Sequence, residues 1–283
     1  MISFDVCYLQ PQTLEEALQA WQEEHAAGRE PRYLAGGTEL VTMARDNRLR
    51  PGALIDLKRL PETTALGTGA SGELRYGACV TLNEVAEAKG FPLLSAACAR
   101  VADHTVRNSI TVGGNVCGML PYREAVLPFL VGDGAAVIAG PEGADASTRT
   151  VPLNECFDKR FALAPGEFLV ALTVSTAAAA AAHWYRRRER DARVDYPLLT
   201  LCAAWIDGAI RIAFAGALGY PLRSRSAEAA LAEAAGSARD RAETFVQALP
   251  GEPKTDMRAS GEYRRELLAQ AVADAISELE GRA

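Results

Sequence analysis

The sequence predicts an α+β fold in which short strands and helices alternate before a mainly helical C-terminal part. Turn signals at residues 71–72 (Ser-Gly) and 207–208 (Asp-Gly) indicate β-hairpins and therefore antiparallel strands. They disfavour a Rossmann-type sheet made of parallel strands only. Apolar residues at helical spacing across residues 263–279 predict a long amphipathic helix near the end of the chain.

The first part of the chain is expected to alternate strand and helix around a pair of glycines. Three stretches are typical of short strands: residues 3–9, 32–35 and 53–57. Thr13 and Glu16 form a capping-box pattern, which predicts the start of a helix that ends before Gly28. Residues 39–45 directly follow the glycine pair and predict a second helix.

The middle of the chain predicts further strands and two more helices. The expected strands are residues 73–76, 135–139 and 168–174. A second capping-box pattern at residues 81–84 predicts a helix that continues to about residue 89. Apolar residues at helical spacing predict another helix, which includes Leu94 and ends at residues 107–108.

The C-terminal part begins with a run of six alanines at residues 177–182. We interpret this run as a connection between two domains, with a helix as the alternative. Basic residues are concentrated in residues 184–193. The remaining expected elements are strands at residues 198–205 and 209–217 and helices at residues 227–235 and 238–249.

Composition sets limits on function. The 283 residues carry a formal net charge of −6, which disfavours nucleic acid as a partner. No apolar run approaches the roughly 20 residues that cross a bilayer. The N-terminus lacks the features of a secretory signal, so we expect a cytoplasmic protein. The six cysteines and three histidines are scattered without a metal-ligand spacing, and we expect buried thiols and no metal site.

Two glycine pairs are the strongest functional signal. They lie in residues 35–39 (Ala-Gly-Gly-Thr-Glu) and 111–115 (Thr-Val-Gly-Gly-Asn). Paired glycines let the backbone approach a ligand closely, and successive amides in such a turn bind anions. Neither pair matches the Rossmann or the Walker pattern. Two such turns on one chain are able to grip a diphosphate from both sides, which indicates a dinucleotide cofactor; two ordinary turns are the alternative.

The order of several segments supports a family resemblance. The segments are residues 33–40 (YLAGGTEL), 54–57 (LIDL), 76–78 (YGA), 106–115 (VRNSITVGGN) and 165–169 (PGEFL). This pattern resembles the FAD-binding subunit of the molybdenum hydroxylases, which include xanthine dehydrogenases and carbon monoxide dehydrogenase. The resemblance continues through residues 185–195 and 213–217 and covers nearly the whole chain. Thr38-Glu39, where the family often has His-Ser, is closer to the xanthine dehydrogenase branch.

The resemblance implies two α+β subdomains that clasp FAD, at about residues 1–55 and 56–175. A C-terminal domain at residues 176–283, with a small antiparallel sheet and a helical bundle, is expected to follow. Both glycine turns would then hold the FAD diphosphate. The implied contacts are Leu34, Ala35, Gly36, Gly37, Thr38 and Glu39 in the first turn, and Thr111, Gly113, Gly114 and Asn115 in the second.

Further site residues come from the same resemblance. Glu124 stands where the family places an aspartate that binds the adenosine ribose; a solvated surface acid is the alternative. Arg187, eight residues before Asp195, stands where some members have a lysine, and a cation there would stabilise the reduced flavin. A solvated strand face is the alternative for Arg187, and Asp195 is expected to pair with one of the arginines in residues 186–193. Two aromatic residues are candidates to cover the flavin ring, or else half-buried strand residues: Tyr185 and Tyr196.

The resemblance implies an electron-transfer role with no catalytic side chain on this chain. Electrons from a molybdopterin large subunit would pass through [2Fe–2S] clusters on a small subunit to FAD on this chain, and then to NAD+ or another acceptor. The complex would be a heterotrimer, with the organic substrate bound by the large subunit. Two alternatives stay open: a stand-alone FAD-dependent oxidoreductase and a scaffold subunit without cofactor.

Overall fold

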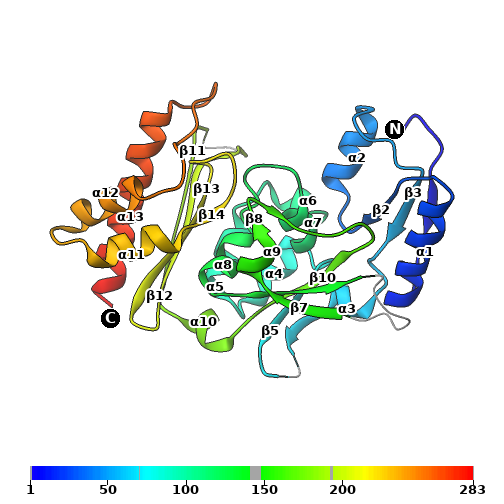
Figure 1. Ribbon diagram of the computed structural model, residues 1–283, viewed down its shortest axis with the longest axis horizontal. Coiled ribbons are helices and arrows are strands. Elements are labelled where there is room, and N and C mark those ends of the chain that lie inside the picture. The colour runs from blue at the N-terminus through cyan, green and yellow to red at the C-terminus, as the bar shows by residue number, and fades with distance from the viewer. Residues whose placement is uncertain (1, 70, 141–147, 192–193, 283) are drawn as a thin grey trace.

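The computed structural model describes residues 2–69, 71–140, 148–191 and 194–282. Within these residues the strands form sheets of three, five and four strands and one two-stranded hairpin. The three larger sheets follow one another along the long axis of the molecule (Figure 1). The N-terminal sheet lies at one end and the C-terminal helices lie at the other. The α+β class predicted from the sequence is confirmed.

The N-terminal unit is a small parallel sheet packed against helix α1. Its elements are β1 (Cys7–Leu9), α1 (Leu14–Ala26), β2 (Pro31–Leu34), α2 (Thr38–Arg45) and β3 (Ala53–Asp56). The strand order is β1-β3-β2, and both pairs are parallel. The Thr13 hydroxyl caps α1 by accepting a hydrogen bond from the Glu16 amide. Buried Ala17 and Leu18 of α1 join Ile55 of β3 in one apolar cluster.

The central unit is an antiparallel sheet surrounded by short helices. The sheet contains β4 (Leu66–Thr68), β5 (Leu74–Gly77), β10 (Phe168–Val174), β6 (Ala135–Ala139) and β7 (Thr148–Pro152), in that order. The other elements are α3 (Pro61–Thr64), α4 (Leu82–Ala88), α5 (Pro92–Ala99), α6 (His104–Arg107), α7 (Val112–Cys117), α8 (Val126–Val131), α9 (Leu153–Cys156), β8 (Phe157–Asp158) and β9 (Arg160–Phe161). The hairpin predicted at residues 71–72 joins β4 to β5. The capping box predicted at residues 81–84 starts α4.

One helix expected to end at residues 107–108 is two helices, so that prediction was wrong. Helix α5 ends at Ala99, and the backbone turns at Ala102, whose φ is +49°. The Asp103 carboxylate then accepts a hydrogen bond from the Val106 amide at 2.8 Å and starts α6. An aspartate favours this N-cap position over a helix interior, which explains the break.

The C-terminal unit is an antiparallel sheet between the central unit and three helices. It contains β11 (His183–Glu189), β12 (Pro197–Ile206), β13 (Ala209–Ala215), β14 (Leu222–Arg223), α11 (Arg225–Glu233), α12 (Ala238–Gln247) and α13 (Gly261–Glu280). Side chains alternate between the faces of a strand. On β12, Leu199 and Leu201 therefore pack among the helices, whereas Cys202 and Ala204 pack against the central unit. The predicted hairpin at residues 207–208 joins β12 to β13.

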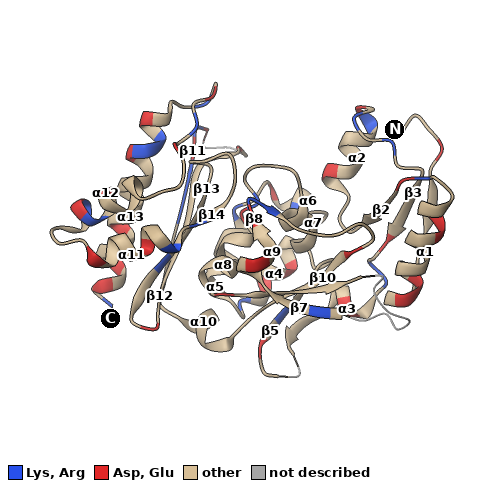
Figure 2. Cartoon of the chain, in the orientation of Figure 1, with Lys and Arg blue, Asp and Glu red and all other residues tan. Residues whose placement is uncertain are grey.

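The alanine run is partly helical, contrary to the interpretation as a plain connection. Helix α10 (Thr176–Ala180) joins β10 to β11, and the Ser175 hydroxyl caps it by accepting from the Ala178 amide at 3.1 Å. Acidic and basic residues are distributed over all three units (Figure 2). In the described parts of the chain, no helix is both long enough and apolar enough to cross a membrane.

Candidate functional site

The first glycine turn connects β2 to α2. Gly37 precedes α2 with a φ of +72°, in the left-handed region that favours glycine. Because glycine has no side chain, this N-cap residue leaves the first amide groups of α2 uncapped. These N–H groups and the positive end of the helix favour an anion. Leu34 packs beneath the turn: a Cβ at Gly37 would lie 2.9 Å from Leu34 Cδ1.

A lysine that the sequence analysis did not select lies beside the first turn. β2 and β3 are parallel neighbours with Leu34 opposite Asp56, so their carboxyl ends meet at one edge of the sheet. Lys58 donates from Nζ to the carbonyl oxygen of Ala35 at 3.1 Å and pairs with the buried Asp56 carboxylate at 2.7 Å. Its position just after an expected strand was the signal that could have identified it.

The second glycine turn starts α7. The Thr111 hydroxyl accepts a hydrogen bond from the Gly114 amide at 3.1 Å, and the Gly113 amide donates to the Ala78 carbonyl at 2.9 Å. A Cβ at Gly113 would lie 2.6 Å from Ala78 Cβ, so packing requires glycine there. Gly114 is exposed, and a Cβ on it would meet only the Thr111 hydroxyl within 4 Å. Gly114 therefore presents open backbone that a ligand can approach.

The two glycine turns touch each other. A Cβ at Gly36 would lie 1.9 Å from the Ser109 carbonyl oxygen and 3.2 Å from Thr111 Cγ2. The Glu39 carboxylate of α2 accepts a hydrogen bond from the Met119 amide, just after α7, at 2.9 Å. The fold thus brings together two segments that are far apart in the sequence, and the starts of α2 and α7 lie side by side.

This arrangement fits the diphosphate of a dinucleotide. The backbones at Gly36 and Gly113 come so close to neighbouring segments that no side chain is accommodated. The uncapped start of α2 offers N–H groups to an anion, and exposed Gly114 leaves space for the anion beside the second turn. Thr38 is exposed at the start of α2, and Asn115 is half-buried on α7, where its Oδ1 accepts from the Ala125 amide at 3.0 Å.

Glu124 and Arg187 form an ion pair with each other. The Glu124 side chain is buried, with Oε2 2.8 Å from Arg187 Nε and Oε1 3.1 Å from Arg187 Nη2. The Thr200 hydroxyl of β12 donates to Glu124 Oε2 at 2.5 Å. Neither side chain is exposed to solvent. The alternatives that placed Glu124 and Arg187 on a solvated surface were therefore wrong. Their proposed contacts with ribose and flavin stay predictions.

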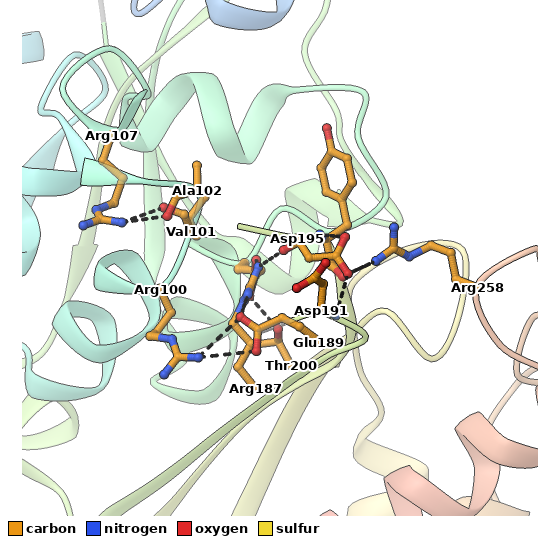
Figure 3. Close-up of polar contacts among 12 residues, drawn as sticks. Arg100, Val101, Ala102, Arg107, Arg187, Glu189, Asp191, Asp195, Thr200 and Arg258 are labelled. Atoms are coloured by element: carbon orange, nitrogen blue, oxygen red, sulfur yellow. Dashed lines mark hydrogen bonds and ion pairs between the residues drawn. The ribbon is translucent and has the colours of Figure 1, made fainter. Parts of the chain in front are cut away.

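Arg187 is held by a wider network around β11 (Figure 3). It also donates to Glu189 and, from Nη2, to the backbone carbonyl of Asp195 at 3.0 Å. Arg100 of the central unit lies 3.3 Å from Glu189 Oε2. Burial alone would lower the pKa of Arg187, but the bond to Glu124 and the charge of Glu189 raise it. Arg187 therefore stays charged at all physiological pH values.

Asp195 pairs with an arginine outside the basic segment from which its partner was expected. The Asp195 carboxylate pairs with Arg258 at 2.5 Å and not with an arginine of β11. Arg193 of the basic segment lies outside the described residues. Tyr196 is half-exposed and stacks on Tyr122, with ring centroids 4.9 Å apart. Tyr185 is partly buried, and its buried hydroxyl group has no hydrogen-bond partner among the described residues.

Four of the six cysteines are buried. In the described segments there is no group of three or more His, Cys, Asp or Glu side chains that could hold a metal ion. Cys79, Cys98, Cys156 and Cys202 are buried as expected, whereas Cys7 and Cys117 are exposed as whole residues, although the Cys117 thiol itself is shielded from water. Burial raises the pKa of Cys79 to about 11, so its thiol stays protonated near neutral pH.

Comparison with known proteins agrees with this geometry. Residues 3–176 match the family described as the FAD binding domain in molybdopterin dehydrogenase. The putative xanthine dehydrogenase FAD-binding subunit XdhB of Escherichia coli is 28% identical over 265 residues, which cover 87% of this chain and 88% of the relative. The carbon monoxide dehydrogenase medium chain of Hydrogenophaga pseudoflava is 26% identical over 267 residues, which cover 88% of this chain and 89% of the relative.

Solved structures show the same likeness over the full chain. A chain of carbon monoxide dehydrogenase from Hydrogenophaga pseudoflava is matched with a TM-score of 0.85 at 26% identity, and the match covers 100% of both chains. A chain of quinoline 2-oxidoreductase from Pseudomonas putida 86 is matched with a TM-score of 0.82 at 26% identity over 99% of both chains. Because the family match spans well over half of the sequence, this chain belongs to the FAD-binding subunits of the molybdenum hydroxylases, and FAD is its cofactor.

Proposed function

We propose that this chain is the electron-transfer subunit of a xanthine dehydrogenase-like molybdenum hydroxylase, in which electrons from [2Fe–2S] clusters of a small subunit reach NAD+. The observation that carries the proposal is the contact between the two glycine turns, at Gly36 and Ser109. FAD, when bound, supplies the exchange between one-electron and two-electron carriers. The chain's own residues bind and orient the cofactor and set the charge around it.

The two glycine turns are proposed to hold the diphosphate. The amides at the start of α2 donate to its oxygens, and the positive end of this helix offsets its charge. Gly114 leaves the diphosphate space beside the second turn. Lys58 adds one positive charge beside the first turn. Leu34, Ala35, Thr38 and Thr111 shape the two turns around these amides. Glu39 acts by holding α2 against the segment after α7.

Glu124 is proposed to accept a hydrogen bond from the adenosine ribose. A carboxylate has about four acceptor positions, and three of those on Glu124 are used by Arg187 and Thr200. The remaining position is on Oε1. Arg187 is proposed to face the flavin as a fixed cation, positioned by Glu124 and Glu189. Its paired carboxylates reduce the net charge that a reduced flavin would meet.

The partners are proposed from the relatives. The relatives include medium chains of carbon monoxide dehydrogenases and a subunit of a 6-hydroxypseudooxynicotine dehydrogenase complex. We therefore propose a heterotrimer with a [2Fe–2S] small subunit and a molybdopterin large subunit that binds the organic substrate. NAD+ as acceptor follows from the likeness to XdhB and from Thr38-Glu39 in the first turn.

A division into an FAD-binding domain at residues 1–175 and a C-terminal domain at residues 176–283 is part of the proposal. The last strand of the five-stranded sheet ends at Val174, and the first strand of the C-terminal sheet begins at His183. Helix α10 lies between them. Within the first domain, the parallel sheet ends at Asp56 and the antiparallel sheet begins at Leu66, which supports two subdomains.

Visible absorption after desalting tests the proposal. The chain is loaded with FAD, alone and co-expressed with its neighbouring genes. A retained flavin spectrum, with Fe–S absorbance in a co-purified complex and bleaching of the flavin band by NADH, is the expected result. Substrate turnover by the isolated chain would instead favour a stand-alone oxidoreductase. A protein that retains no flavin in either preparation would contradict the proposal and favour a scaffold subunit.

A further inference from the structure

Asn83 is a buried amide near the start of α4, and only 6% of the residue is exposed. Its Nδ2 donates to the His104 carbonyl oxygen at 2.8 Å and to Asn108 Oδ1 at 2.6 Å. Its Oδ1 accepts from Arg107 Nε at 2.9 Å. Three of the four hydrogen-bonding positions of the amide are therefore used, and all three partners belong to one short segment, residues 104–108. A buried amide of this kind fixes the groups that it binds, because a broken bond would leave unpaired polar atoms in the interior.

Arg107 extends this cluster to the backbone that precedes α6. Its Nη1 donates to the carbonyl oxygens of Val101 at 3.1 Å and Ala102 at 2.8 Å, as Figure 3 shows. Ala102 has the φ of +49° at which the backbone turns between α5 and α6. The Asn83 amide thus holds the Arg107 guanidinium, which in turn holds the turn before α6. Together these hydrogen bonds tie both ends of α6 to α4.

The segment that Asn83 holds also carries the contact between the two glycine turns. Its next residue is Ser109, whose carbonyl oxygen would lie 1.9 Å from a Cβ at Gly36. The carbonyl oxygen of Ile110 accepts from the first amide of α4 at 2.9 Å, which adds a backbone bond to the side-chain bonds of Asn83. Residues 107–111 therefore meet the start of α4 on one side and the first glycine turn on the other.

We propose that Asn83 is a positioning residue for the FAD diphosphate. It holds residues 107–110 so that the Ser109 carbonyl lies against Gly36 and the two glycine turns keep the separation that a diphosphate fits. The inference rests on the proposed function and deepens it, because it names the residue that sets the distance between the two turns. Groups that bind a ligand must be held to within about 0.5 Å by neighbours with fixed conformations. The approach at Gly36 cannot absorb a shift of Ser109, because the carbonyl already occupies the place of a side chain.

The test compares two substitutions that make the same change of charge. Asn83→Asp keeps an acceptor for Arg107 but removes the two donated hydrogen bonds. Asn108→Asp keeps the acceptor for the Asn83 amide and so preserves the cluster. FAD and ADP, which share the diphosphate, are titrated into the cofactor-depleted full-length chain. We expect Asn83→Asp to weaken the binding of both ligands by about tenfold, as loss of the groups that orient metal ligands does at metal sites. Asn108→Asp should bind both like wild type.

Two further variants separate positioning from a loss of stability. Ser95→Ala removes a buried hydrogen bond of 3.0 Å from the Ser95 hydroxyl of α5 to the Val85 carbonyl of α4. It should lower the melting temperature of the cofactor-free chain, but it should leave the ADP affinity, measured well below that temperature, unchanged. Asn108→Leu removes one hydrogen bond of the Asn83 cluster and should weaken ADP binding severalfold. Because residue 108 is exposed, this variant decides the question even if Asn83→Asp does not fold.

The outcomes distinguish the two proposals. Wild-type ADP affinity in a folded Asn83→Asp chain, or in Asn108→Leu, would show a purely structural amide and overturn this inference alone. The same holds if Ser95→Ala or Asn108→Asp weakens ADP binding as much as Asn83→Asp does, because stability or charge would then explain the loss. Failure of the wild type to bind either FAD or ADP would overturn the proposed function as well.

Discussion

Glu124 and Arg187, 63 residues apart in sequence, form a buried ion pair that joins the central unit to the C-terminal sheet. Both side chains are almost completely buried, and Thr200 completes the group. A buried pair of this kind contributes little net stability as a pair, but loss of one partner leaves an uncompensated charge. The pair therefore specifies how the two parts of the chain fit together beside the predicted cofactor position.

Removal of one member of this pair should strongly destabilise the chain. We expect Arg187→Met to lower the free energy of unfolding by about 3–5 kcal/mol, because Glu124 is left buried without its cation. The double variant Arg187→Met with Glu124→Leu should lose less free energy of unfolding than the two single variants lose in sum. Urea denaturation followed by circular dichroism measures both. The control is Arg239→Met, which removes an exposed ion pair with Glu266. It should lower the free energy of unfolding by about 1 kcal/mol or less.

Gly114→Val should remove FAD binding from a folded protein. Gly114 is exposed, so a valine side chain there would fill the space beside the second turn that the diphosphate needs. Gly37→Val is the weaker test, because the φ of +72° at Gly37 would strain any other residue and disturb folding as well.

The control for Gly114→Val is Gly219→Val. Gly219 has no neighbour within 4 Å of an added Cβ and no positive φ, so the substitution changes only surface. The bound flavin per protein, measured by absorbance after desalting, should be near zero for Gly114→Val and equal to wild type for Gly219→Val. Stoichiometric flavin in both variants would contradict the assignment of the second turn to the diphosphate.

Arg264 should be essential for attaching α13 to the C-terminal sheet. Its fully buried guanidinium donates to the carbonyl oxygens of Leu198 and Gly216 at 2.8 and 2.9 Å. Arg264→Met leaves these acceptors unpaired in the interior, and we expect a loss of about 3–5 kcal/mol in the free energy of unfolding. The neighbouring Arg265→Met, at an exposed pair, should cost about 1 kcal/mol or less. Similar values for the two variants would contradict the proposed attachment.

Asp256 should make the chain sensitive to acid. Burial alone would raise the pKa of its carboxyl group, but hydrogen bonds from the Arg258 amide and the Arg264 guanidinium hold the pKa well below its ordinary value of 3.8. A lowered folded-state pKa contributes stability that is present above pH 3.8 and is lost as the pH falls through the folded-state value. Unfolding free energies of Asp256→Asn should therefore fall less steeply below pH 3.8 than those of wild type.

The control for this pH dependence is Asp274→Asn. Asp274 is about one-third exposed, and its contact with Arg186 is 3.5 Å long, so its replacement should change the free energy of unfolding little. If the free energy of unfolding of Asp256→Asn falls with pH as steeply as that of wild type, other carboxyl groups dominate the acid response.

Local signals in the sequence predicted many of the elements. The strands at residues 135–139 and 168–174 occur at the predicted positions, because a run of apolar residues is sufficient to identify a buried strand. The Asp207-Gly208 hairpin follows from the positive φ that both of its turn residues adopt. By contrast, the break between α5 and α6 was missed, because the apolar spacing continues across Ala102 and hides the N-cap at Asp103.

By itself, the sequence determined the fold class, most strand and helix positions and the two glycine turns, because each depends on residues that are neighbours along the chain. Only the tertiary structure decided that Gly36 lies against Ser109 and that Glu124 pairs with Arg187. These relationships join segments separated by tens of residues. They depend on how the sheets pack and on which polar groups lose access to water, and no local pattern of residues records either.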